Sequence, residues 1–216
     1  MKVQHMLPED IERTSMDMIS RELYERGIVL PKEHDAVVKR VIHTTADFDF
    51  ARNLHFTPNA VDLAKEALSG GSAIVTDTNM AKAGISKSAL AKLGGQVCCF
   101  MADEDVARTA KEKGTTRAVA AMEKAVKQFP NAVFAIGNAP TALLRIAELI
   151  EEGLRPALVI GVPVGFVNVV ESKEAALAAC QAKGIPAILA MGQKGGSSVA
   201  AAVCNALLYQ SIEPPY

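Results

Sequence analysis

Beyond residue 71 the chain repeats one pattern five times, a short apolar run of strand length followed by a stretch of helical character. Strands that alternate with helices are joined by right-handed crossovers and form a parallel sheet with helices on both faces. The pattern therefore predicts a three-layer α/β/α fold around a five-stranded, parallel, doubly wound sheet, to which we assign the strand order 2-1-3-4-5. The predicted strands are Ala73–Thr76, Gln96–Phe100, Ala132–Ile136, Ala157–Ile160 and Ala187–Ala190.

Helical stretches precede, separate and follow these strands. Residues 1–70 form an N-terminal helical extension, and residues 71–210 form the sheet core of a single domain spanning 1–216. The extension is expected to hold helices at Pro8–Arg26, at Pro31–Thr45 and from Thr57 to Gly70. The helices of the core are expected at Asn79–Leu93 with a break near Gly84, Asp103–Gln128 with a break near Gly114, Pro140–Glu152, Glu171–Lys183 and Ser197–Leu208.

The composition agrees with this fold and excludes several classes of protein. Half of the 216 residues are apolar and only 5% are aromatic, so the core is built from small aliphatic side chains, as in a parallel sheet buried on both faces. A net charge of −1 argues against nucleic-acid binding. The four cysteines have no metal or redox spacing and are interpreted as reduced structural thiols. Because the sequence shows neither a signal-peptide core nor an apolar stretch long enough to span a membrane, we expect a soluble cytoplasmic protein.

Two strand ends carry the strongest indication of a ligand site. The runs Ala132–Ile136 and Ala157–Ile160 each end in glycine and continue into a turn that contains proline. In open parallel sheets ligands bind at the carboxyl ends of strands, close to helix N-termini that favour anions. The assigned order puts the switch point between Thr76–Asn79 and Gly137–Thr141, where Asn138 is a candidate ligand-facing amide. The same turn is also compatible with a simple helix cap.

Two further segments are candidates for chemistry. Arg40 and His43 are three residues apart in a predicted helix and so share a face, although such a pair is a weak signal by itself and the spacing favours an exposed, solvated helix surface. In Gly114-Thr115-Thr116-Arg117, two hydroxyls and a guanidinium stand at a predicted helix start, where they favour an anionic group. The alternative there is a capping motif with Arg117 merely exposed.

Other motifs weaken the common enzyme classes. The loop Gly192–Ser198 resembles a phosphate loop only loosely, because it lacks the Gly-Lys-Ser/Thr ending. The chain has no Gly-x-Gly-x-x-Gly fingerprint, no His-Glu-x-x-His metal motif and no Gly-x-Ser-x-Gly elbow. A dehydrogenase, a zinc enzyme and a serine hydrolase are therefore disfavoured, and no metal site is expected. The loop Gly161–Phe166 is unusually apolar, which indicates that it packs against a flat apolar partner.

Taken together, these segments resemble the precorrin-8X methylmutase family, the precorrin isomerases, including its cobalt-precorrin-8 members. The resemblance extends from about Ile11 to Leu208. Its most specific parts are AIGNAPTAL (135–143) and GVPVGFVNVVESK (161–173). RVIHTT (40–45), GTTRAV (114–119) and GGSSVAAA (195–202) support it in the same order. Gln193-Lys194 departs from the family pattern, in which many relatives carry arginine.

The resemblance implies an isomerase of cobalamin biosynthesis that moves a methyl group from C11 to C12 of a corrin precursor. It also implies a flavodoxin-like fold, a homodimer and an intramolecular rearrangement that needs no redox cofactor. The family's catalytic histidine falls on His43. Its substrate-contacting residues fall on Ser15, Arg40 and Arg117.

The expected substrate chemistry agrees with the residues. A corrinoid is a broad, partly apolar ring edged with carboxylates, so it needs apolar walls, which Val162–Phe166 would supply, and polar or cationic donors at the rim. A histidine that protonates the conjugated ring would act as a general acid. The alternatives are a non-catalytic corrinoid or tetrapyrrole carrier and, further away, a nucleotide-binding domain. The rim donors expected from the sequence are Ser15, Arg40, Thr115, Thr116, Arg117 and Asn138.

Overall fold

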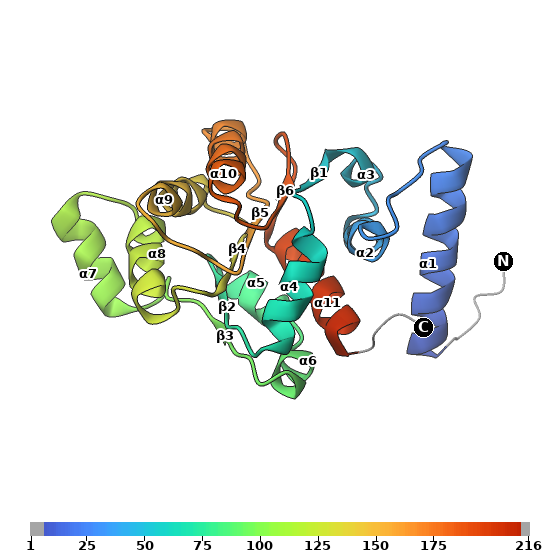
Figure 1. Ribbon diagram of the computed structural model, residues 1–216, viewed down its shortest axis with the longest axis horizontal. Coiled ribbons are helices and arrows are strands. Elements are labelled where there is room, and N and C mark those ends of the chain that lie inside the picture. The colour runs from blue at the N-terminus through green and yellow to red at the C-terminus, as the bar shows by residue number, and fades with distance from the viewer. Residues whose placement is uncertain (1–6, 213–216) are drawn as a thin grey trace.

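The computed structural model describes residues 7–212, and its central feature is a six-stranded, mostly parallel sheet (Figure 1). All five strands predicted from the sequence are present, and they follow the predicted 2-1-3-4-5 order. Residues 1–6 of the predicted helical extension lie outside the described part of the chain. In spatial order the strands are β1 (Leu54–Phe56), β6 (Ala187–Ala190), β5 (Leu158–Gly161), β4 (Val133–Ile136), β2 (Ile74–Thr76) and β3 (Val97–Cys98).

The sequence prediction missed the sixth strand, β1, which lies at the sheet edge within the segment expected to be helical. It pairs antiparallel with β6, so that Leu54 lies opposite Ala190. The hydroxyl of Thr57 continues this edge by accepting a 2.8 Å hydrogen bond from the backbone N–H of Ala187, 130 residues away in the sequence. Three residues contain too little alternation to be recognised as a strand, and a partner so distant leaves no local signal.

Helices cover both faces of the sheet, which confirms the predicted three layers (Figure 1). Successive strand residues point to opposite faces. Ile74 and Val133 therefore join one apolar cluster, whereas Val75 and Phe134 join the other. One face is covered by α7 (Glu104–Lys113), α8 (Arg117–Gln128), α9 (Pro140–Glu151) and α10 (Val169–Lys183). The other is covered by α2 (Asp35–Thr45), α4 (Ala60–Ser69), α5 (Asn79–Gly84), α6 (Lys87–Lys92) and α11 (Ser197–Ile212), with α1 (Pro8–Glu25) packed on α2 and α3 (Phe50–Asn53) beside β1.

The helix breaks predicted at two glycines are confirmed. The first core helix is divided into α5 and α6 just after Gly84. The second is divided at Gly114, which ends α7 with a left-handed φ of 62° that suits glycine. Helix ends differ from the prediction by a few residues, because α2 begins at Asp35 and α11 continues to Ile212. The single turn of α3 was not predicted.

Helix α11 is enclosed by neighbours on several sides, since it contacts α2, α4, α5 and α6. Its residues from Val199 to Cys204 are all buried. Small side chains permit this packing: a Cβ placed on Gly84 of α5 would lie 2.9 Å from the Cβ of Ala201. Among the helices described, none combines the length and apolar character needed to cross a membrane.

Candidate functional site

At the carboxyl edge of the sheet, a buried carboxylate from the end of β2 holds the turn that follows β4. Asp77 is 1% exposed, and its oxygens accept hydrogen bonds from the backbone N–H groups of residues 137, 138 and 139 at 2.8, 2.8 and 2.6 Å. Burial raises the pKa of Asp77, while the three N–H donors act in the opposite direction. The sequence predicted that donors at this switch point would bind a ligand anion; these three instead bind the protein's own carboxylate.

The start of α11 closes the same junction. The hydroxyls of Thr78 and Ser197 lie 2.8 Å apart, and a Cβ on Gly137 would lie 2.8 Å from the Cα of Ser197. The crevice between β2 and β4 is thus filled by polypeptide. The side chain of Asn138 is exposed, and its predicted role as a ligand-facing amide stays a prediction.

The loop after β6 packs directly on the loop after β5. A Cβ on Gly195 would lie 2.1 Å from the carbonyl oxygen of Val162, so only glycine fits at this position. Lys173 of α10, which is fully buried, donates hydrogen bonds to the carbonyl oxygens of Gly192 at 2.6 Å and Lys194 at 2.9 Å. Burial lowers the pKa of Lys173 to about 8. Lys173 and the close backbone contact together fix the loop 191–196.

This loop is joined in turn to the segment that follows α2. The ammonium group of Lys194 lies 2.6 Å from a carboxylate oxygen of Asp47 and 2.6 Å from one of Asp49. The hydrogen bond from Lys194 lowers the pKa of Asp47. Lys194, at the position where the sequence departs from the family pattern, therefore connects the sheet edge to the chain just beyond His43.

Arg40 and His43 lie on the outward side of α2, because the helix buries the side chains of Val37, Val38, Val41 and Ile42. His43 is exposed, in the last turn of the helix. The Arg40 side chain is only 20% exposed, since its guanidinium contacts a carboxylate oxygen of Glu12 at 2.5 Å and lies 5.2 Å from the ring centroid of Tyr209. Arg40 thus contacts neighbouring side chains while His43 is open to solvent, and the solvated-surface alternative stays open for the pair. Ser15 is half-buried on α1, one turn after Glu12.

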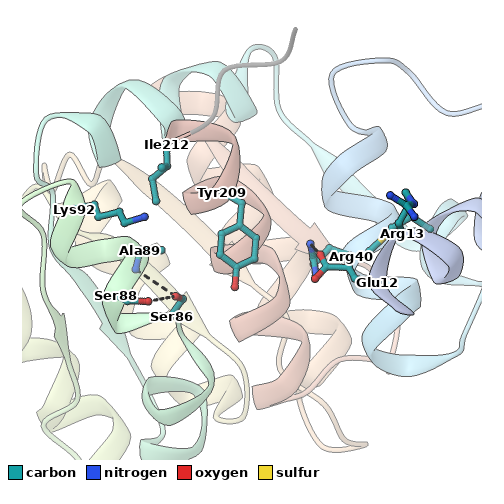
Figure 2. Close-up of a pocket in the computed structure, with 10 residues that line it drawn as sticks. Glu12, Arg13, Arg40, Ser86, Ser88, Ala89, Lys92, Tyr209 and Ile212 are labelled. Carbon is teal, nitrogen blue, oxygen red and sulfur yellow. Dashed lines mark hydrogen bonds and ion pairs between the residues drawn. The ribbon is translucent and has the colours of Figure 1, made fainter. Parts of the chain in front are cut away.

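Arg40 lies in the wall of a cleft of about 760 Å³ (Figure 2). Residues of α1 and α2 form one side of the cleft, and residues of α6 and its N-cap form the other. The C-terminal part of α11 lies between the two sides. The lining combines cationic, hydroxyl and apolar groups, as a partly apolar polyacid requires. It consists of Glu12, Arg13, Met16, Arg40, Ser86, Ser88, Ala89, Lys92, Tyr209 and Ile212.

The Gly-Thr-Thr-Arg segment lies at the start of α8. Thr116 caps the helix, because its hydroxyl accepts a 3.2 Å hydrogen bond from the Val119 N–H, which confirms the capping interpretation for this residue. The same hydroxyl lies 3.2 Å from that of Thr141, which places the segment next to the turn that contains Asn138. Arg117 is exposed, so its predicted role in binding stays a prediction.

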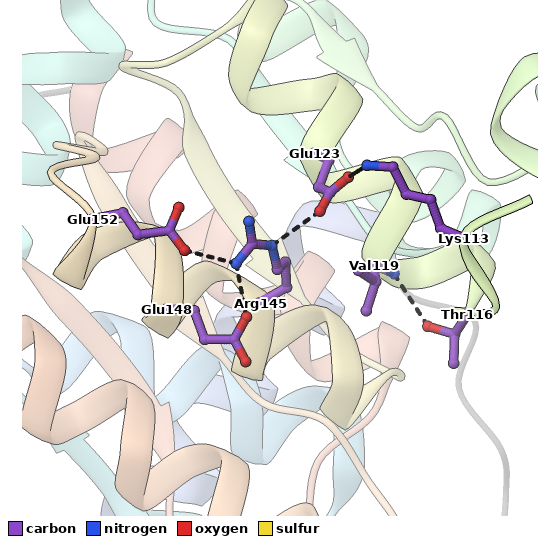
Figure 3. Close-up of polar contacts among 7 residues, drawn as sticks. All are labelled: Lys113, Thr116, Val119, Glu123, Arg145, Glu148 and Glu152. Carbon is purple, nitrogen blue, oxygen red and sulfur yellow. Dashed lines mark hydrogen bonds and ion pairs between the residues drawn. The ribbon is translucent and has the colours of Figure 1, made fainter. Parts of the chain in front are cut away.

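An ionic network holds the helices behind this segment together (Figure 3). Arg145 of α9 contacts carboxylates of Glu123, Glu148 and Glu152 at 3.2, 2.8 and 3.0 Å. Lys113, at the end of α7, lies 2.7 Å from Glu123 and lowers the pKa of that carboxyl group. The network joins α7, α8 and α9 next to the turn at Thr116 and Arg117.

The predicted site residues thus form two groups on helices that cover opposite faces of the sheet (Figure 1). Ser15, Arg40 and His43 lie on α1 and α2. The other group lies at the starts of α8 and α9 and consists of Thr115, Thr116, Arg117 and Asn138.

Only part of the apolar wall predicted at Val162–Phe166 is exposed to a ligand. Val162 is fully buried in the core, so it contacts protein rather than a ligand, and this part of the expectation was wrong. Phe166 is 85% exposed and Val167 is 79% exposed. Large apolar side chains presented in this way are available to contact a flat apolar partner.

Within residues 7–212, no three His, Cys, Asp or Glu side chains gather in a way that would hold a metal ion. All four cysteines are free. Burial raises the pKa values of the Cys180 and Cys204 thiols to about 12, so both stay protonated and unreactive at neutral pH.

Sequence reasoning missed three charged residues that organise these regions. Asp77 directly follows a strand, which is a usable signal, because polar residues at that position face the carboxyl edge. Lys173 ends the most specific motif, but a lysine in a helix is normally expected to face solvent. Glu12 gave no signal, since its partner Arg40 is 28 residues away.

Comparison with known proteins gives a consistent result along nearly the whole chain. The family model described as precorrin-8X methylmutase matches residues 10–210. The cobalt-precorrin-8 methylmutase of Salmonella typhimurium is 45% identical over 206 residues, covering 94% of this chain and 95% of the relative. The enzyme of the same name from Priestia megaterium is 43% identical, covering 93% and 87%.

A relative named for precorrin-8X and a solved structure agree. The precorrin-8X methylmutase of Pseudomonas aeruginosa is 38% identical over 91% of this chain and 93% of its own length. The crystal structure of precorrin-8X methylmutase from Thermus thermophilus superposes with a TM-score of 0.84 at 35% identity, covering 94% of this chain and 97% of that one. The likeness thus extends over nearly the whole chain.

Proposed function

This chain belongs to the precorrin-8X methylmutase family, and from that premise we propose that it moves the C11 methyl group of precorrin-8X or cobalt-precorrin-8 to C12. The product is hydrobyrinic acid or, with cobalt, cobyrinic acid. The methylmutases are isomerases of cobalamin biosynthesis. The observation that carries the proposal is the family match over residues 10–210, which spans α1, α2 and nearly all of the sheet core.

His43 is the proposed proton donor. It is exposed in the last turn of α2, one turn from Arg40, although it does not itself line the cleft that Arg40 lines. Protonation of the conjugated ring, held in the correct tautomer, makes the methyl shift easier. A positioned general acid contributes about 10²–10⁴ in rate.

The remaining candidates are proposed to bind the substrate rather than react with it. Arg40 and Ser15 contact carboxylates near His43. Arg117, Thr115, Thr116 and Asn138 contact carboxylates farther round the ring, since they form a separate group at the starts of α8 and α9. Arginine suits this role because its planar fork matches a carboxylate in two hydrogen bonds.

The rearrangement is intramolecular, so the proposed reaction requires no redox cofactor. We further propose that residues 1–216 act as one domain, that two chains form a homodimer and that the protein acts in the cytoplasm. The corrinoid is the proposed small-molecule partner.

The test is conversion of precorrin-8X and of cobalt-precorrin-8 by the purified protein, each followed by absorbance and identified by mass and NMR. Progressive change to the spectrum of hydrobyrinic or cobyrinic acid is the expected result. The alternative, a carrier, predicts a static bound spectrum with no product. Stabilisation by ATP or NAD without any effect of a corrinoid would indicate a nucleotide-binding domain instead.

A further inference from the structure

The cleft beside Arg40 carries more positive than negative side chains. Three of the residues that line it are cationic, namely Arg13, Arg40 and Lys92. Glu12 is the single carboxylate in the lining. The whole chain has a net charge of −1, so this surface is locally enriched in positive charge. Such a cleft attracts an anionic ligand and strengthens its binding.

Arg40 is not free in this cleft, because Glu12 of α1 reaches across to it. The contact is made by one guanidinium nitrogen to one carboxylate oxygen, at 2.5 Å. A guanidinium has five N–H donors, so a single-nitrogen contact leaves most of them available. The ring of Tyr209, 5.2 Å from the guanidinium carbon, restricts the orientation of the group.

The Glu12 side chain is 50% exposed, whereas that of Arg40 is 20% exposed. An ion pair with one half-exposed partner contributes little, because water screens it and two side chains must be ordered. A ligand carboxylate that forms two parallel hydrogen bonds with Arg40 binds more strongly than this single contact. A ligand carboxylate can therefore displace Glu12 from Arg40.

Lys92 lies on the opposite side of the cleft, on α6, with its ammonium group directed towards Tyr209 and Ile212 (Figure 2). Among residues 10–212, no carboxylate lies within ion-pair distance of it. Beside it, Ser86 and Ser88 present hydroxyl groups 3.3 Å apart. This wall can therefore accept a second carboxylate at a distance from Arg40.

We propose that Glu12 occupies Arg40 in the free protein until a substrate carboxylate displaces it, while Lys92 binds a second carboxylate from the facing wall. This inference rests on the proposed function, which supplies a polyacid ligand. Glu12 then weakens binding of substrate and product alike, and so favours release of the product. Glu12 thus sets the affinity of the cleft for carboxylates and takes no part in the proton transfer.

The test is an equilibrium titration of the full-length protein with cobyrinic acid, followed by corrin absorbance, and repeated with its fully methyl-esterified form. Glu12→Gln should tighten binding of the acid about three- to fivefold, as loss of an exposed ion pair allows. Lys92→Met should weaken binding of the acid by a similar factor. Neither substitution should change binding of the neutral ester by more than about 1.5-fold.

Glu22→Gln is the matched control, since Glu22 lies on the same helix and forms a similar exposed pair with Arg26 away from the cleft. It should change neither affinity. Unchanged or weaker binding of the acid by Glu12→Gln would overturn the proposal, as would equal tightening of acid and ester. Failure of the wild-type protein both to bind cobyrinic acid and to turn over precorrin-8X would instead refute the proposed function, and this inference with it.

Discussion

Replacement of Asp77 by asparagine tests how the carboxyl edge of the sheet is held together. Asp77→Asn keeps the shape of the side chain but exchanges one acceptor oxygen for an NH₂ donor. The native carboxylate accepts three backbone hydrogen bonds, one at Oδ1 from Gly137 and two at Oδ2 from Asn138 and Ala139. The single oxygen of the amide can accept the bonds at one of these two positions but not at both.

The magnitude follows from the better of the two amide orientations. With its oxygen at the Oδ2 position, the asparagine keeps the bonds to residues 138 and 139 and turns its NH₂ group towards the N–H of Gly137. One buried donor is then unpaired, which costs about 1–3 kcal/mol. The two retained bonds also lose charge assistance, about 1–2 kcal/mol more. Part of this is offset because a buried charge is removed, so we expect a net loss of about 2–4 kcal/mol.

Urea unfolding followed by circular dichroism measures this loss directly, and thermal unfolding should show a Tm lower by about 4–16 °C. Asp62→Asn is the control, because Asp62 is an exposed carboxylate paired only with Lys65, and its loss should cost less than about 1 kcal/mol. An Asp77→Asn protein within about 0.5 kcal/mol of wild type would refute the view that this carboxylate holds the turn.

Two further substitutions test the buried lysine and the second group of candidate residues. Burial lowers the pKa of Lys173 from 10.5 to about 8, so the unfolded chain binds more protons than the folded protein between these pH values. The stability of wild type relative to Lys173→Met should therefore rise by up to about 3 kcal/mol from pH 8 to 10.5 in urea unfolding, and a constant difference would contradict the shift. Arg117→Gln should raise KM about tenfold or more with kcat nearly unchanged, whereas an unchanged KM would exclude Arg117 from substrate binding.

The sheet was predictable because its strands leave a strong local pattern. Each predicted run is apolar, of strand length and followed by a helix, and the same runs form β2 to β6 in the assigned order. Gly114 likewise marks a helix break through its left-handed conformation, and the break near Gly84 lies directly after that residue. The antiparallel strand β1 was missed because Leu54–Phe56 acquires its structure from β6, which is far away in the sequence.

The site was predictable only in part, for a related reason. The pairing of Arg40 with His43 on one helix face follows from their spacing, and the cap at Thr116 follows from its place before a helix. The contacts that surround these residues join segments that lie far apart in the sequence. The Glu12–Arg40 pair and the hydrogen bonds that Asp77 accepts from the turn after β4 produce no periodic pattern in the sequence. Only the folded chain therefore reveals them.

His43 is proposed to donate a proton to a polyacid macrocycle, and turnover by His43→Ala tests this role most directly. Single-turnover conversion of precorrin-8X should fall by about 10²–10⁴ while affinity for cobyrinic acid changes only a few-fold. His55→Ala, which alters an exposed histidine on β1, should retain normal turnover. A His43→Ala protein that converts precorrin-8X within a few-fold of the wild-type rate would contradict the account.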